Sequence, residues 1–194
     1  MKNFLFTYIV YKLDKWYKEE NNISNNENNF SLLKIMKLLF FVVTASIEID
    51  KSDNKSSNLL INNDKKLNNF LFDKFSALPL GHVESEIYNN IKSKELQNFV
   101  EITIEKSSII ENLVNVESEI YNQGLIDLKQ IIDGSIEFLK NKNSKLILES
   151  HSQLIDLSHK HFSWVYYFDM ARKFNKSSQQ IPNDIIIKEH KFFS

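Results

Sequence analysis

The chain has 194 residues, with 24 basic and 25 acidic side chains, a formal net charge of −1 and no cysteine. A chain of this length can bury a core of its own as one domain, and the lack of cysteine excludes disulfides and thiolate metal sites. Arg172 is the single arginine and basic residues are not in excess, so sequence-specific DNA binding is not expected and nucleic acid is not an expected partner.

Glycine occurs three times and proline twice. Because these residues interrupt regular structure, their scarcity favours long helices over a many-stranded barrel. We therefore expect a mainly α fold, a compact helical single domain over 1–194 with its core at about 30–193. A cytoplasmic location is expected because the N-terminal segment carries early charges and no signal-peptide cleavage pattern.

A first helix is expected over 3–20, where aromatic and aliphatic side chains recur at helical spacing. Ser31 can then cap a second helix over 32–47, the most apolar stretch of the chain. At about 16 residues this stretch is shorter than the roughly 20 that span a membrane, so no membrane association is expected. Lys34 and Lys37 are three residues apart and are expected to mark the solvent-exposed edge of the helix.

The middle of the chain mixes polar and short apolar segments. Residues 50–69 are rich in Asn, Ser and Lys and are expected to form a long polar insertion. One or two short strands, or a small β-hairpin, are expected near 70–76 and 99–105. Between them, residues 78–81 (LPLG) have the composition of a turn, and a short helix is expected over 83–91.

The C-terminal half is expected to be helical, with a last helix capped by Asn183. The expected helices before it cover 107–122, 125–142, 145–161 and 164–174.

No catalytic or cofactor-binding motif is recognisable. Three glycines cannot build a phosphate-binding loop, and no nucleophilic serine motif is present. The one group of potential metal ligands is His151, Asp156, His159 and His161, which lacks the i, i+4 histidine pair of zinc proteases. The alternative interpretation is a helix C-terminus, where histidine and lysine favour the negative end of the dipole. We expect no enzyme activity, no cofactor and no metal, and a metal-dependent hydrolase is the less favoured alternative.

Three segments follow one another in a characteristic order. They are 33–41 (LKIMKLLFF), 75–83 (FSALPLGHV) followed by Tyr88, and 154–159 (LIDLSH) followed by Trp164. They are similar to the opening helix, to the F-x-A-W-x-Y-G-P-V hallmark and to the L-S-H…W helix end of the Panacea domain family, which includes SocA-like antitoxins.

This resemblance implies an antitoxin that binds and neutralises a toxin encoded beside it by direct protein–protein complex formation. The chain departs from the hallmark where Leu78, Leu80 and His82 replace Trp, Tyr and Pro, and in the 50–69 insertion. In physical terms, Gly81 is expected to permit the turn. The resemblance implies a partner-binding or motif role for Leu78, Pro79, Leu80, Gly81, His82, Val83, Tyr88, His159 and Trp164.

Other functions stay open. Some members of the family deliver a toxin to a protease, and a non-catalytic scaffold or adaptor subunit of a bacterial or phage-defence assembly would carry the same fold. A DNA-binding regulator of its own operon is disfavoured by the single arginine. The expected partner is a protein, and the sequence leaves its identity and the oligomeric state open.

Overall fold

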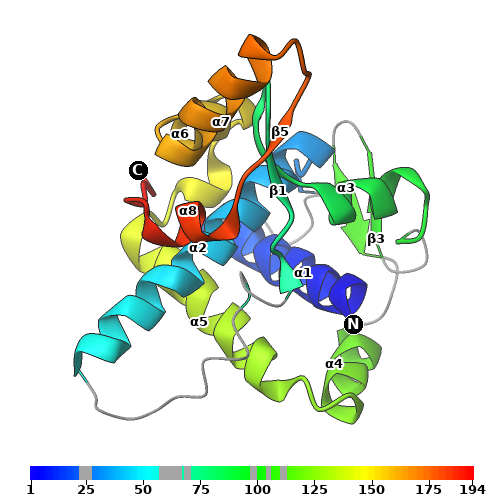
Figure 1. The fold of residues 1–194 in the computed structure, drawn as a ribbon. Coiled ribbons are helices and arrows are strands. Elements are labelled where there is room, and N and C mark those ends of the chain that lie inside the picture. Colours follow the sequence, from blue (N-terminus) through cyan, green and yellow to red (C-terminus); the bar gives the residue numbers. More distant parts are fainter. Residues whose placement is uncertain (22–27, 57–66, 68–70, 97–99, 104–105, 110–112) are drawn as a thin grey trace.

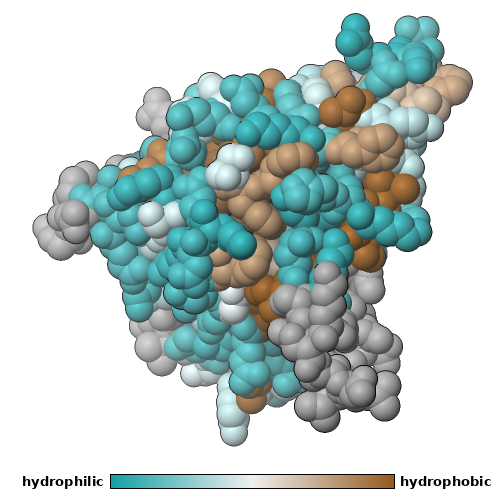
Figure 2. All heavy atoms as spheres, turned by 90° about the vertical axis from the view of Figure 1, so that its left-hand side faces the viewer, coloured by the Kyte–Doolittle hydropathy of each residue, from teal (hydrophilic) through white to brown (hydrophobic). Residues whose placement is uncertain are grey.

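The computed structural model describes residues 1–21, 28–56, 67, 71–96, 100–103, 106–109 and 113–194. The fold is mainly α with a few short antiparallel strands (Figure 1), which confirms the predicted fold class. The elements are α1 (Lys2–Asn21), α2 (Leu32–Ser56), β1 (Phe75–Leu78), β2 (Gly81–Glu84), α3 (Ser85–Lys92), β3 (Val100–Ile102), β4 (Ser107–Ile109), α4 (Leu113–Asn122), α5 (Ile126–Lys142), η2 (Leu146–Leu148), α6 (His151–His159), α7 (Phe162–Lys173), β5 (Gln179–Gln180) and α8 (Asn183–Lys188). On the side that carries the C-terminus, hydrophilic side chains predominate and hydrophobic ones gather in places (Figure 2).

Helix α2 forms the centre of the fold. Every residue from 34 to 47 is buried, and α2 contacts α5, α6, α8 and β2. A helix that is apolar around most of its circumference must be covered on all sides. Its two buried hydroxyl groups bond within the helix, since Thr44 Oγ1 donates to the Phe40 carbonyl at 2.9 Å and Ser46 Oγ to the Val43 carbonyl at 2.7 Å.

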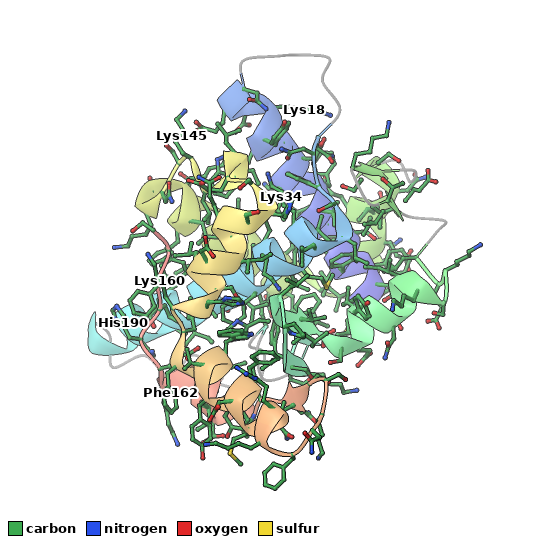
Figure 3. All side chains as sticks on the ribbon, turned by 90° about the horizontal axis from the view of Figure 1, so that it is seen from above. Lys18, Lys34, Lys145, Lys160, Phe162 and His190 are labelled. Carbon is green, nitrogen blue, oxygen red and sulfur yellow. The ribbon has the colours of Figure 1, made fainter. Side chains whose placement is uncertain are left out.

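Lys34 and Lys37 of α2 lie inside the protein, so the prediction that they mark a solvent-exposed edge is wrong. Lys34 is 1% exposed and Lys37 is 0% exposed. Lys34 Nζ donates to Asn29 Oδ1 at 2.8 Å and lies 5.4 Å from the centroid of the Phe30 ring. Burial lowers the pKa of Lys34 to about 8. Figure 3 shows Lys34 among the helices. The elements that cover α2 include α5, α6 and β2, which come from distant parts of the chain. The periodicity within α2 therefore could not predict that these lysines would be covered.

Two small antiparallel sheets accompany the helices. The first has the strand order β2-β1-β5, and Leu78 lies opposite Gly81, so the hairpin turns through the two residues between them. The second pairs β3 with β4. The strands predicted near 70–76 and 99–105 therefore belong to two separate hairpins, and the first of them lies at 75–78.

The helices predicted over 3–20, 125–142 and 164–174 are confirmed to within about two residues. The polar insertion predicted over 50–69 is helical as far as residue 56, because α2 continues, and its remainder lies outside the described residues except for position 67.

Other predicted boundaries differ for local reasons. The helix predicted over 83–91 begins at Ser85, because residues 81–84 pair with β1 and the Glu84 side chain accepts the Ile87 N–H at 2.7 Å as an N-cap. The helix predicted over 107–122 begins at Leu113, since its first residues form β4.

The helix predicted over 145–161 is divided at Ser150. The Ser150 side chain accepts the Gln153 N–H and the Gln153 side chain accepts the Ser150 N–H, which is a capping box that starts α6. Asn183 is the first residue of α8 and Pro182 is its N-cap, so the predicted cap is displaced by one position.

Candidate functional site

The tip of the β1–β2 hairpin lies against α2 and α6 at Gly81. Gly81 has φ +97°, a conformation that side chains other than glycine rarely adopt. A β carbon at this position would lie 2.8 Å from Ser158 Oγ and 2.9 Å from Lys37 Cε. Glycine is therefore required here for two reasons, the backbone conformation and the close approach. The sequence predicted only the first, because Gly81 was expected to permit the turn.

Lys37 reaches this point from α2. Its Nζ donates to the His82 carbonyl at 2.7 Å, and among the described residues no carboxylate pairs with it. Burial lowers the pKa of Lys37 to about 7, because desolvation penalises the ammonium. A lysine that was expected at the surface thus supports the hairpin from inside.

His82 is the centre of a buried polar network. Its Nδ1 lies 2.8 Å from Ser158 Oγ, and its Nε2 lies 2.8 Å from Ser163 Oγ. Ser163 donates its hydroxyl to Glu189 Oε1 at 2.9 Å and its N–H to Glu189 Oε2 at 2.7 Å. Ser163 Oγ must therefore accept from His82 Nε2–H, which leaves Nδ1 to accept from Ser158. The network joins β2 to α6, to α7 and to the segment after α8.

The surroundings of His82 keep its ring neutral. Burial lowers the pKa of His82 well below its usual value, and the positive charge of Lys37 acts in the same direction. The Phe40 ring stacks on the imidazole with centroids 3.8 Å apart, and His161 meets it edge-on at 5.8 Å. Burial likewise lowers the pKa of His161 to about 4.

The network resembles a catalytic relay in composition only. Ser158 and Ser163 are both 0% exposed, so neither hydroxyl is open to a substrate. Burial raises the pKa of Glu189, while the two hydrogen bonds from Ser163 oppose that rise. What this arrangement does chemically is satisfy buried polar groups and fix the position of the hairpin.

Trp164 joins the hairpin to α7. Its Nε1–H donates to the Leu78 carbonyl at 2.8 Å, and the His159 ring stacks on the indole with centroids 3.4 Å apart. Burial lowers the pKa of His159, with the charge of Lys37 contributing. The second segment of the resemblance, 75–83, is thus in direct contact with Trp164, which follows the third segment.

The structure divides the nine motif residues by exposure. Gly81, His82 and Val83 are buried, and Leu78, Tyr88, His159 and Trp164 are half-buried. Pro79 and Leu80, at the turn, are exposed, and Leu80 keeps 52% of its surface open to solvent. Most of the motif therefore packs into the fold, and the turn is its most solvent-exposed part.

Leu80 borders an open groove with a volume of about 370 Å³. We call it the hairpin groove, and it is lined by Ser31, Leu32, Leu33, Met36, Leu80, Val83, Tyr88 and His151. The groove combines three motif residues with the first turns of α2 and the start of α6. The sequence did not identify these α2 residues as a surface, because the exposed edge of the helix was expected at Lys34 and Lys37.

The four potential metal ligands are not brought together. His151 is exposed at the hairpin groove, Asp156 is exposed on α6, His159 stacks on Trp164 and His161 is buried beside His82. Within the described part of the chain, no group of three or more His, Asp or Glu side chains is arranged to hold a metal ion.

Ser158 lies in the third segment of the resemblance, 154–159, but no motif in the sequence pointed to Ser163 or Glu189. Their role depends on the return of the chain after α8, which brings Glu189 beside the start of α7.

Comparisons with models of protein families, with curated proteins and with solved structures found no match for the chain. Among the helices that the structure describes, none combines the length and the apolar character that crossing a membrane requires.

Proposed function

We propose that this protein is an antitoxin-like binding protein, which neutralises a toxin encoded nearby by forming a direct complex with it. One observation carries the proposal: the three segments that resemble the Panacea domain family meet at His82. Lys37 of the first segment donates to the His82 carbonyl, and Ser158 of the third bonds to the His82 ring, at 2.7 Å and 2.8 Å. Segments that share one structural task are expected to occur together in a family, which supports the resemblance.

The exposed turn and the hairpin groove are the surface on which the toxin would bind. The groove presents aliphatic and aromatic side chains around Leu80, and removing such apolar surface from water is favourable. A stable complex buries roughly 800 Å² on each partner, so the contact would extend beyond the groove itself. The buried network beneath the turn keeps the surface preformed, which lowers the entropic cost of binding.

The test is co-expression of this chain with the protein encoded in the neighbouring reading frame. We expect the neighbour alone to stop growth, and this chain to restore growth and co-purify with it. The variant Leu80→Asp should weaken co-purification, because it places a charge in an apolar contact. The matched control is Ile126→Asp, which alters an exposed aliphatic residue at the start of α5.

Each outcome has a defined meaning. A harmless neighbour that does not co-purify would refute the proposal. A harmless neighbour that binds would instead favour a scaffold or adaptor subunit. Restored growth with a fall in the amount of the neighbour would indicate delivery to a protease. Equal effects of Leu80→Asp and Ile126→Asp would exclude the hairpin groove as the binding surface.

A further inference from the structure

Helix α7 has an exposed face that no described segment covers. We call it the α7 outer face, and it consists of Phe162, Val165, Tyr166, Asp169, Arg172 and Lys173. These positions follow the i, i+3, i+4, i+7 spacing of one side of a helix. Phe162, Val165 and Tyr166 are 57%, 50% and 47% exposed. Figure 3 shows Phe162 at the outer edge of the molecule.

The apolar residues lie at the N-terminal end of this face, and they are large. The rings of Phe162 and Tyr166 stack with centroids 5.5 Å apart, which makes a continuous aromatic surface. A contiguous exposed apolar patch that is bordered by polar residues is typical of a protein-binding site. The other side of α7 is occupied, since Ser163 and Ala171 are buried against the fold.

The C-terminal end of the same face is basic. Lys173 pairs with Asp169 at 2.8 Å, while Arg172 has no ion-pair partner among the described residues. The only arginine of the chain is therefore on the same exposed face as Phe162 and Tyr166. Arginine is enriched with tyrosine and tryptophan at the energetically important positions of interfaces, whereas lysine is depleted there.

A shallow groove on the flank of α7 adds a place for a large side chain. It has a volume of about 410 Å³ and is lined by Tyr166, Tyr167, Met170, Phe174, Lys176 and Gln179. Tyr166 borders both the groove and the α7 outer face. Lys176 is exposed at its rim and, like Arg172, has no described ion-pair partner. Within the described residues, Arg172 and Lys176 thus leave two unpaired positive charges at the C-terminal end of α7 and beside the groove.

We propose that the α7 outer face binds an amphipathic, acidic helix of the partner protein in an antiparallel orientation. Apolar side chains of that helix would cover Phe162, Val165 and Tyr166, and carboxylates in its first turn would lie over Arg172 and Lys173. The inference rests on the proposed function only for the identity of the partner, because the site is defined by the chemistry of α7.

The antiparallel orientation follows from charge. The C-terminus of α7 is the negative end of its dipole, and an antiparallel partner brings its positive N-terminal end there. Acidic residues are also favourable in the first turn of the partner helix itself. The same carboxylates thus interact with their own helix and with Arg172. Helix α7 has 12 residues, about 18 Å in length, so three to four turns of a partner helix match it.

The site can be tested with a synthetic peptide and the intact chain. The probe is an acetylated, fluorescently labelled helix of about 16 residues with leucines at heptad spacing and glutamates in its first two turns. A second peptide carries lysine in place of each glutamate. Binding is measured by fluorescence anisotropy at low and high salt, and a 12-nucleotide uridine oligonucleotide tests for nucleic acid.

We expect the acidic peptide to bind the native chain and the lysine peptide to bind about tenfold more weakly or not at all. Arg172→Glu should reverse this preference, which a general loss of folding would not do. Lys15→Glu, which alters an exposed lysine of α1, is the charge-matched control and should leave the preference intact. Phe162→Ser should weaken both peptides.

Several results would overturn the inference. They are no saturable binding of the acidic peptide, equal binding of the two peptides, or an unchanged preference in Arg172→Glu. Tighter binding of the oligonucleotide would instead indicate a nucleic-acid surface, and a dimer that Phe162→Ser dissociates would indicate a second copy of this chain. Because the probe is synthetic, a negative result leaves the co-expression test of the proposed function unaffected.

Discussion

Substitution of Gly81 by alanine tests whether the hairpin tip is packed as closely as the structure shows. The backbone at φ +97° is strained for alanine, at about 1–2 kcal/mol. The new β carbon would also lie 2.8 Å from Ser158 Oγ and 2.9 Å from Lys37 Cε. Neither atom can move freely, because both side chains are hydrogen-bonded to His82. Overpacking of this kind costs about 1–3 kcal/mol, so the free energy of unfolding should fall by about 2–5 kcal/mol in total.

The control is Gly124→Ala. Gly124 also has a positive φ, +65°, but a β carbon there would have no neighbour within 4 Å. It should therefore show only the conformational cost of about 1–2 kcal/mol. Both variants and the native chain are unfolded in urea and followed by circular dichroism, with the denaturant dependence compared between them. Equal losses in the two variants would refute the close contact of Gly81 with α2 and α6.

Two further predictions concern the residues around the hairpin. Folding lowers the pKa of Lys37 from 10.5 to about 7, so the unfolded chain binds more protons between these values and the free energy of unfolding should rise with pH across that window. Lys37→Met should remove a few kcal/mol of this rise. The measurement is urea unfolding of both proteins at about pH 7 and pH 9.5. An equal change in the free energy of unfolding between the two pH values in both proteins would contradict the prediction. Trp164→Phe removes the hydrogen bond to the Leu78 carbonyl at 2.8 Å and should lower the free energy of unfolding by about 1 kcal/mol, whereas no loss in a urea titration would show that the bond is not needed.

Local sequence signals located the longer helices well. The segment 32–47 was expected as a helix because it is the most apolar stretch of the chain, and α2 covers it, with residues 34–47 buried. The turn at 78–81 was expected from Pro79 and Gly81, and a tight turn joins β1 and β2 there. These features depend on residues near one another in the chain, so composition and spacing were sufficient to predict them.

The candidate site was predicted only in part. The resemblance singled out 75–83 and 154–159 with Trp164, and these are in contact through Trp164 and Leu78. It did not distinguish supporting residues from accessible ones, because exposure depends on what packs above each residue. Lys37 shows this most clearly: as a lysine it was expected in solvent, yet the hairpin and α6 enclose it.

By itself the sequence determined the helical class, the central apolar helix and the glycine turn, because the causes of these features are local. Only the tertiary structure decided that Ser163 accepts from the His82 ring and in turn donates to Glu189, which is 26 positions further along the chain. Only it showed that the aromatic residues after His161 lie partly on an uncovered face of α7. A hydrogen-bond partner or a covering segment can come from anywhere in the chain, so spacing along the sequence contains no record of it until the chain has folded.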